Sequence, residues 1–248
     1  MTGDEGFYVF TGIVSLQNII KRDFSESSWA VEYHPPFLMS IYAIVYSVYV
    51  LYQVVRNGNI SLQSLYEEGS KLFSGQRTLL IIRILPCLFS SLSSIFLYLL
   101  VFQLLGNHYV ALAAALIFAL HPISIGITSL TILEPGLIFF YIGSTWLFFL
   151  GIQPPFSPLI LGISGILFGL AVASREGGYF LPISILMISF LGLILPSQYS
   201  FLNIQYFSLL VFWMIIGILT FYITWPYIWR HPFARMIENL RIVSKMKG

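Results

Sequence analysis

Charged residues are scarce in this chain of 248 residues. Only 9% of its residues are Asp, Glu, Lys or Arg, whereas a soluble domain carries roughly a quarter. The net charge of +2 and the lack of a basic stripe interleaved with aromatic residues argue against a nucleic-acid-binding protein. Cys87 is the single cysteine, which excludes an internal disulfide and a cysteine-rich zinc cluster. Its place in an apolar run indicates a packing role.

Apolar residues are abundant in the chain: 58% of its residues are apolar and 17% are aromatic. A membrane-spanning helix needs about 20 mostly apolar residues, because lipid offers no partner to an unpaired backbone group. The sequence therefore predicts an all-α, polytopic transmembrane helical bundle. The apolar stretches that predict its helices are residues 37–55, 79–105, 109–123, 136–150, 158–173, 180–195 and 206–224.

The polar segments between these stretches differ in character. Residues 5–20 place apolar side chains near helical spacing, which predicts a helix lying in the membrane interface. Three connections, at residues 106–108, 151–157 and 196–202, are short and contain no Lys or Arg. The charged residues therefore gather in the other connections.

A few charged residues stand inside or beside the apolar runs: Arg83 in TLLIIRILPCLF, Glu134 in SLTILEPGLIFF and Arg175 in AVASREGGYFLP. A charge at membrane depth costs several kcal/mol unless its side chain reaches the interface. Interfacial snorkelling remains an alternative for the two arginines, whereas Glu134 is too short to reach far. Acids can serve as general bases and arginines can neutralise a phosphate leaving group. With the opening pair Asp4 and Glu5, the set predicts a site for a lipid-phosphate substrate.

Five motifs follow one another between residues 4 and 182. An Asp-Glu pair opens the chain, a His-Pro-Pro follows at residue 34, and then come the segments RILPCLFSSLSSIFLYLLVFQLLG, ALAAALIFALHPISIGITSLTILEPGLIFF and GLAVASREGGYFLP. In this order they resemble the GT-C class of membrane glycosyltransferases, and within it the protein O-mannosyltransferase-like and aminoarabinose-transferase-like family. The longest segment resembles the family pattern almost position for position, with Glu134 where an Asp is usual.

The resemblance implies transfer of a sugar, with mannose expected, from a polyprenyl or dolichyl phosphate carrier to a protein or lipid hydroxyl. It assigns Asp4 as the catalytic base, with Glu5 supporting it. It makes Arg83 and Arg175 ligands of the phosphate. Glu134 is expected to position Arg83 or the acceptor.

The resemblance also implies a role for His34 in the first external loop, where the His-Pro-Pro shapes the loop beneath the lipid-linked sugar. A cap or a hydrogen bond within the loop is the alternative role of His34. We expect no metal site and no other cofactor, because the opening Asp-Glu pair has no third ligand beside it in the sequence. The expected partners are thus the polyprenyl-phosphate donor, the protein or lipid acceptor and membrane lipids, with no nucleic acid.

The expected organisation is a single domain over residues 1–248. It comprises a first external loop (1–36), a juxtamembrane or re-entrant helix (37–55), transmembrane helices (79–224) and an interfacial tail (225–248). The active face is expected to be external or lumenal, in a cell or endoplasmic-reticulum membrane. If 37–55 spanned the bilayer, Asp4 and Glu134 would lie on opposite sides and could not form one site.

Two features of the sequence oppose this interpretation. The family topology places every Lys and Arg on the outer face, contrary to the usual inside bias. Relatives also carry a transmembrane helix ahead of the Asp-Glu pair, so the chain is expected to be an N-terminally truncated fragment.

Two other functions therefore stay open. One is a small transporter or channel, which should show paired broken helices or an internal repeat. The other is a non-catalytic remnant of the enzyme.

Overall fold

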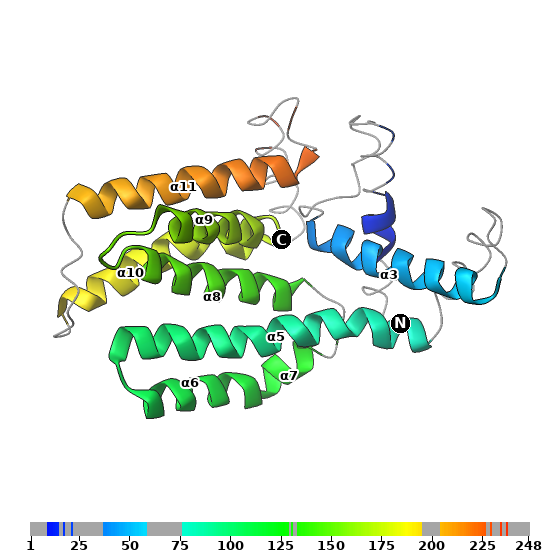
Figure 1. Ribbon diagram of the computed structural model, residues 1–248, viewed down its shortest axis with the longest axis horizontal. Coiled ribbons are helices and arrows are strands. Elements are labelled where there is room, and N and C mark those ends of the chain that lie inside the picture. The colour runs from blue at the N-terminus through cyan, green and yellow to red at the C-terminus, as the bar shows by residue number, and fades with distance from the viewer. Residues whose placement is uncertain are drawn as a thin grey trace.

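The computed structural model describes residues 9–14, 17, 21, 37–58, 76–128, 130, 133–194, 204–226, 229, 234 and 237. Among these residues every regular element is helical, which confirms the predicted all-α class. Figure 1 shows the arrangement of the helices. They are α3 (Phe37–Arg56), α5 (Gln76–Leu105), α6 (His108–Leu120), α7 (Pro122–Thr128), α8 (Glu134–Gly151), α9 (Pro158–Val172), the 3-10 helix η1 (Glu176–Phe180), α10 (Leu181–Ile194) and α11 (Ile204–Thr224).

The helices follow the predicted apolar stretches within a few residues, with one exception. The stretch 109–123 divides into α6 and α7 at His121, whose backbone is extended (φ −65°, ψ 128°). Pro122 follows directly, and a proline disfavours the helical conformation in the residue before it and cannot continue the ladder of hydrogen bonds. The proline therefore ends α6 and begins α7.

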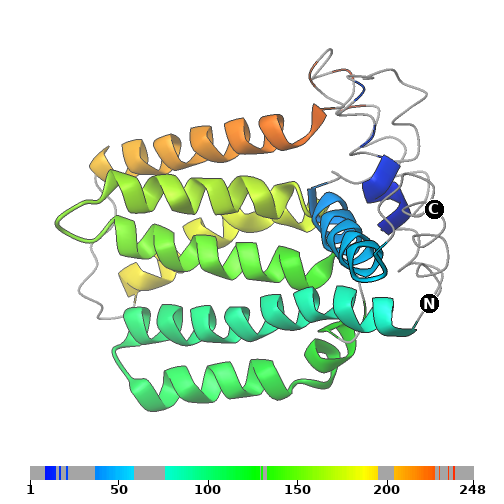
Figure 2. The same ribbon diagram turned by 45° about the vertical axis from the view of Figure 1, so that its right-hand side comes forward.

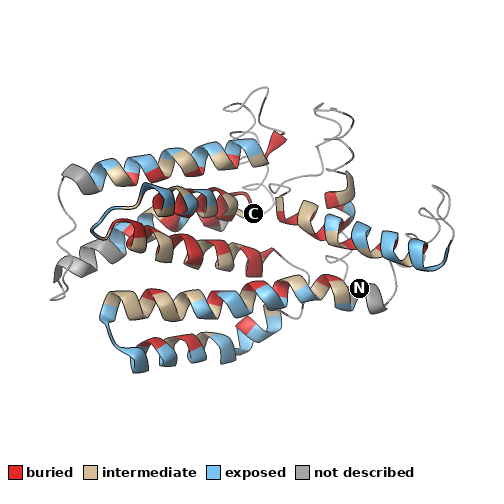
Figure 3. Ribbon diagram, viewed as in Figure 1, coloured by how far each residue is buried: buried red, intermediate tan, exposed pale blue. Residues whose placement is uncertain are grey.

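In the part of the chain that the structure describes, four helices are long and apolar enough to cross a membrane, and the chain is an integral membrane protein. Many residues on the outer faces of the helices are exposed, as Figure 3 shows, and their side chains are apolar. A bilayer accepts such surfaces, because lipid tails are as apolar as the side chains. The candidate spans are Phe37–Arg56, Leu80–Leu105, Glu134–Gly151 and Phe207–Thr224.

The bundle has two distinct ends, which Figures 1 and 2 show in agreement. The connections 106–107 and 152–157 lie at one end. The starts of α5 and α8 and the ends of α9 and α11 lie at the other, which we call the charged end because it carries Arg83, Glu134 and Arg175. α8 lies between α5 and α9, which gives the charged end a well-packed base.

Helix α3 lies at the charged end and does not run alongside the bundle helices. In Figure 2 it is seen nearly end-on, while α5, α8 and α9 are seen along their length. Its first residues are buried: Leu38 and Met39 are 0% and 1% exposed. Phe37 meets Phe140 of α8 with ring centroids 5.9 Å apart. The start of α3 is thus packed onto the start of α8.

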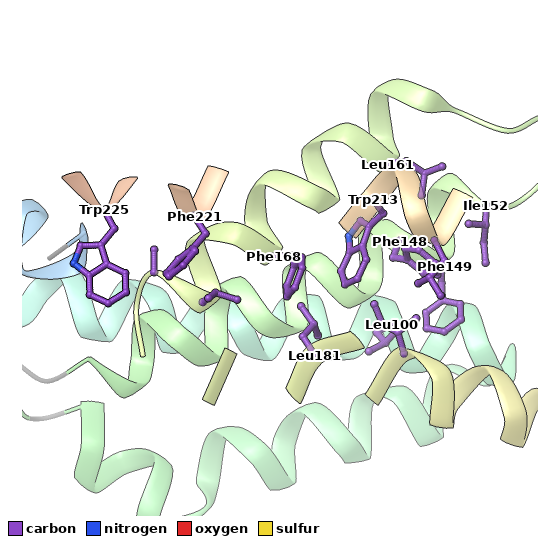
Figure 4. Packing of buried hydrophobic residues seen from close by; sticks show 14 residues of the cluster. Leu100, Phe148, Phe149, Ile152, Leu161, Phe168, Leu181, Trp213, Phe221 and Trp225 are labelled. Atoms are coloured by element: carbon purple, nitrogen blue, oxygen red, sulfur yellow. The ribbon is translucent and has the colours of Figure 1, made fainter. Parts of the chain in front are cut away.

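A large hydrophobic cluster joins α8, α9 and α11 and extends along the bundle to Phe221 and Trp225 at the charged end (Figure 4). Trp213 is fully buried there and stacks on Phe168, with centroids 4.4 Å apart. Three hydrogen bonds cross this apolar region. Ser144 Oγ donates to Ser164 O (2.8 Å), Ser164 Oγ donates to Ser144 O (2.7 Å), and Trp213 Nε1 donates to Ser164 Oγ (2.9 Å). Such bonds hold neighbouring helices together in a membrane, where hydrophobic attraction between helices is weak.

Glycines let α9 and α11 approach closely. A Cβ added to Gly169 would lie 2.5 Å from both Gly217 O and Thr220 Cβ. A Cβ added to Gly165 would lie 2.9 Å from Trp213 O. Gly165 and Gly169 form a Gly-x-x-x-Gly pattern on one face of α9, a usual means of close helix packing in membranes.

Candidate functional site

Glu134 begins α8 at the charged end. The preceding residue, Leu133, makes no side-chain capping hydrogen bond and is 1% exposed, so it anchors the helix start in the core. Pro135 occupies the first turn, where its missing N–H leaves no hydrogen bond unmade. A carboxylate in the first turn also interacts favourably with the positive end of the helix dipole. The sequence Leu-Glu-Pro therefore places an acid at a fixed point of the bundle surface.

Arg175 lies just after α9, where the chain turns back. Ser174 closes the helix end: its N–H donates to Ala171 O (3.1 Å) and its Oγ donates to Leu170 O (2.6 Å). Arg175 itself is extended, with φ −167° and ψ 159°, and η1 follows. Gly178 lets the chain pack closely against the end of α9 as it turns back, because an added Cβ there would lie 2.5 Å from the Ala171 carbonyl carbon. The Arg175 N–H still donates to Ala171 O (3.3 Å), and the extended backbone of Arg175 ends the helix there.

Arg175 and Glu134 form an ion pair between Nη1 and Oε1. Their side chains are 39% and 31% exposed, so the pair is open on one side. The sequence predicted that Glu134 positions Arg83 or the acceptor, and the structure pairs Glu134 with Arg175. A guanidinium has five donors in a planar fork. One carboxylate oxygen occupies only part of this fork, so the pair leaves donor capacity for an anion.

Arg83 lies at the same level of the bundle as Glu134. Helices α5 and α8 run in the same direction (Figures 1 and 2), and Phe89 contacts Phe140 with ring centroids 5.8 Å apart. Arg83 precedes Phe89 by six residues on α5, and Glu134 precedes Phe140 by six residues on α8. Six residues of helix span about 9 Å. The Arg83 side chain is partly exposed. Sequence spacing alone could not give this register, because it follows from the parallel packing of the two helices.

A second hydrophobic cluster, here called the junction cluster, lies beneath these side chains. Among its buried members are Ile82 beside Arg83, Leu133 beside Glu134, Ala171 four residues before Arg175, and Leu38 of α3. Val9, 1% exposed, belongs to it as well. The cluster thus joins the segments that carry three of the predicted site residues.

The other predicted site residues, Asp4, Glu5 and His34, lie outside the described residues. Among the described residues no group of three or more His, Cys, Asp or Glu side chains is placed to hold a metal ion.

Sequence reasoning missed two glycines near the site. Gly136 follows Glu134 by two residues and receives the Leu38 side chain, and Gly12 lies against Met39 of α3. A signal for the first was present, because a glycine directly after Glu-Pro is a poor choice for a helix start unless another element approaches closely.

A comparison with known proteins identifies the family of the chain. The profile of the dolichyl-phosphate-mannose-protein mannosyltransferase family matches residues 65–225, which include α5 through α11 together with Arg83, Glu134 and Arg175. No curated protein and no solved structure matches the chain. Because the family profile covers well over half of its length, the chain belongs to the dolichyl-phosphate-mannose-protein mannosyltransferase family.

Proposed function

We propose that the chain transfers mannose from a dolichyl or other polyprenyl phosphate to a protein hydroxyl at the charged end of the bundle. The observation that carries the proposal is the half-open Arg175–Glu134 ion pair, which lies inside the matched family region. A charged pair at the membrane boundary suits a substrate whose phosphate lies at the interface and whose lipid tail enters the bilayer. The exposed apolar faces of the helices suit such a tail.

The proposed reaction is a displacement at the anomeric carbon. The acceptor hydroxyl oxygen forms a bond to C1 of mannose, and the bond from C1 to the phosphate oxygen breaks. The electron pair leaves with the polyprenyl phosphate, and the hydroxyl proton passes to the carboxylate of Asp4. Negative charge therefore grows on the departing phosphate, where arginines stabilise the transition state more than the ground state.

The roles at the charged end follow from the ion pair. Arg175 binds the phosphate with the donors that Glu134 leaves open, and Glu134 fixes the orientation of the guanidinium. Arg83, at the same level on α5, supplies a second positive charge. The two arginines approach from different helices, so the phosphate lies between α5 and the turn after α9.

Covalent geometry supports the proposed base. Val9 belongs to the junction cluster and follows Asp4 by five residues, and five residues of extended chain reach at most roughly 18 Å. The hydrocarbon core of a bilayer is about 30 Å thick. The chain between Asp4 and Val9 is therefore too short to place Asp4 on the opposite side of the membrane from the junction cluster. The position of α3 at the charged end favours a juxtamembrane helix over a spanning one, with the active face external or lumenal.

The test is mannose transfer by the purified chain in liposomes. The donor is radiolabelled polyprenyl-phosphate mannose and the acceptor a peptide that contains Ser and Thr. We expect label in the peptide with the wild type, and a loss of about 100-fold or more with Asp4→Asn at unchanged donor binding. Absence of transfer by the wild type, or full activity of Asp4→Asn, would contradict the proposal or its base, respectively.

A further inference from the structure

We propose that α3 is a positioning element: through two glycine contacts, Gly136 on α8 and Gly12 on the N-terminal helical segment (residues 9–14), it holds this segment at the charged end, which carries the Arg175–Glu134 pair. This role rests on the proposed function, since the start of the chain carries the proposed base. Neither glycine contacts the reacting groups. Both act through α3.

The first contact joins α3 to the start of α8. A Cβ added to Gly136 would overlap Leu38 Cδ1 and lie 2.8 Å from its Cδ2. Leu38 is 0% exposed and belongs to the junction cluster with Leu133. Leu38 therefore fills the space that a side chain at position 136 would occupy. This contact lies two residues from Glu134, so it fixes α3 relative to the ion pair.

The second contact joins the N-terminal segment to α3. A Cβ added to Gly12 would overlap the Met39 carbonyl oxygen and lie 2.5 Å from the Met39 carbonyl carbon. It would also lie 3.0 Å from Ala43 Cβ. The neighbouring Val9 and Thr11 are 1% and 2% exposed, so the segment is packed tightly. The N-terminal segment, α3 and α8 thus form one continuous line of close contacts.

The two contacts differ in what they can tolerate. At Gly136 the obstacle is the end of a leucine side chain, which a smaller residue at position 38 would remove. At Gly12 the obstacle is the backbone of α3, which no substitution removes. α8 is held between α5 and α9, so an added methyl group at Gly136 should displace α3 rather than α8. A displacement of about 1 Å can lower a reaction rate roughly 100-fold.

The experiment measures packing and transfer for each variant in two matched reconstituted proteins, one with and one without a pair of introduced cysteines. Packing is measured with Phe37→Cys and Phe140→Cys in a Cys87→Ser background, using a short thiol cross-linker across the contact of α3 with α8. Transfer is measured in the proteins without these cysteines. The variants are Gly136→Ala, Leu38→Ala, their combination, and Gly12→Ala. The matched control is Gly162→Ala, whose added Cβ would meet only Ile216 Cδ1, at 3.8 Å.

We expect Gly136→Ala to lower kcat by ten- to 100-fold and to lower cross-linking, with little change in KM for the donor, because both arginines stay in place. Adding Leu38→Ala should restore both quantities by several-fold. Gly12→Ala should lower transfer without being restored by Leu38→Ala, and it should leave the cross-link between α3 and α8 in place. Gly162→Ala should match the wild type in both assays.

Other results overturn the proposal. Wild-type transfer rates in Gly136→Ala would show that α3 need not be held in place. Loss of transfer with unchanged cross-linking, or no restoration by Leu38→Ala, would show that Gly136 acts on Glu134 directly. Cross-linking between the cysteines at positions 37 and 140, together with no mannose transfer by the wild type, would refute the proposed function and with it the positioning role. Failure of the rescue when the wild type is active refutes the positioning role alone.

Discussion

The close packing of α9 on α11 makes Gly169→Ala the sharpest test of the bundle. The added Cβ would lie 2.5 Å from Gly217 O and from Thr220 Cβ, about 1 Å inside a normal contact. One neighbour is backbone, so rotation of a side chain cannot relieve the overlap and α9 and α11 must move apart. Overpacking of this kind typically costs about 1–3 kcal/mol.

A second substitution on the same helix separates this overlap from the effect of replacing glycine. Alanine favours a helix over glycine by about 0.5–1 kcal/mol, and this gain is common to Gly169→Ala and Gly162→Ala. The nearest atom to a Cβ at Gly162 is Ile216 Cδ1, at 3.8 Å, so no overlap arises there. The difference in unfolding free energy between the two variants should therefore equal the overpacking term, about 1–3 kcal/mol in favour of Gly162→Ala.

The assay is equilibrium unfolding of the purified protein by SDS in mixed micelles, followed by far-UV circular dichroism and by tryptophan fluorescence. Trp213, one of the five tryptophans of the chain, lies in this region: it is fully buried, and its carbonyl oxygen would lie 2.9 Å from a Cβ at Gly165. Identical unfolding curves for Gly169→Ala and Gly162→Ala would refute the close approach of α9 and α11.

Three further outcomes are expected. Ser164→Ala removes the hydrogen-bond acceptor of Trp213 and should destabilise the protein by about 1–2 kcal/mol in the same assay. The double variant Ser164→Ala, Trp213→Phe should lose less stability than the sum of the two single variants, because no indole N–H is then left unpaired. Arg83→Ala should abolish mannose transfer and Arg83→Lys should retain a fraction of it, since lysine keeps the charge and loses the fork; equal rates would remove Arg83 from the site. Glu134→Gln should change stability by less than about 1 kcal/mol, because the pair with Arg175 is solvent-exposed on one side, yet it should lower transfer at least tenfold; a matching loss of stability would indicate a structural role instead.

The fold was largely predictable because lipid imposes a simple rule on the backbone. Apolar runs of sufficient length must form helices, and α5, α8 and α11 begin and end within three residues of the predicted stretches. The split between α6 and α7 was missed, although Pro122 was the signal for it. The close packing of α9 and α11 was missed too, although Gly165 and Gly169 stand at the spacing typical of such contacts.

The charged residues of the candidate site stand out in the sequence, whereas their pairing does not. Charged side chains in apolar runs are rare enough to identify Arg83, Glu134 and Arg175 from the sequence. Their pairing depends on where the chain turns after α9 and on the parallel register of α5 and α8, and neither is encoded in local spacing. The roles of Gly12 and Gly136 depend on the approach of α3, which no periodicity predicts.

Mannose transfer by Arg175 variants, measured together with donor binding, tests the central claim most directly. Arg175 is paired with Glu134 and lies inside the matched family region. Loss of one charge-stabilising group in a transition state typically lowers kcat roughly 100-fold or more. We predict such a loss for Arg175→Ala, a partial rate for Arg175→Lys and weaker donor binding in both, with the helical content unchanged. Wild-type transfer by Arg175→Ala would contradict the assignment of the charged end as the site of mannose transfer.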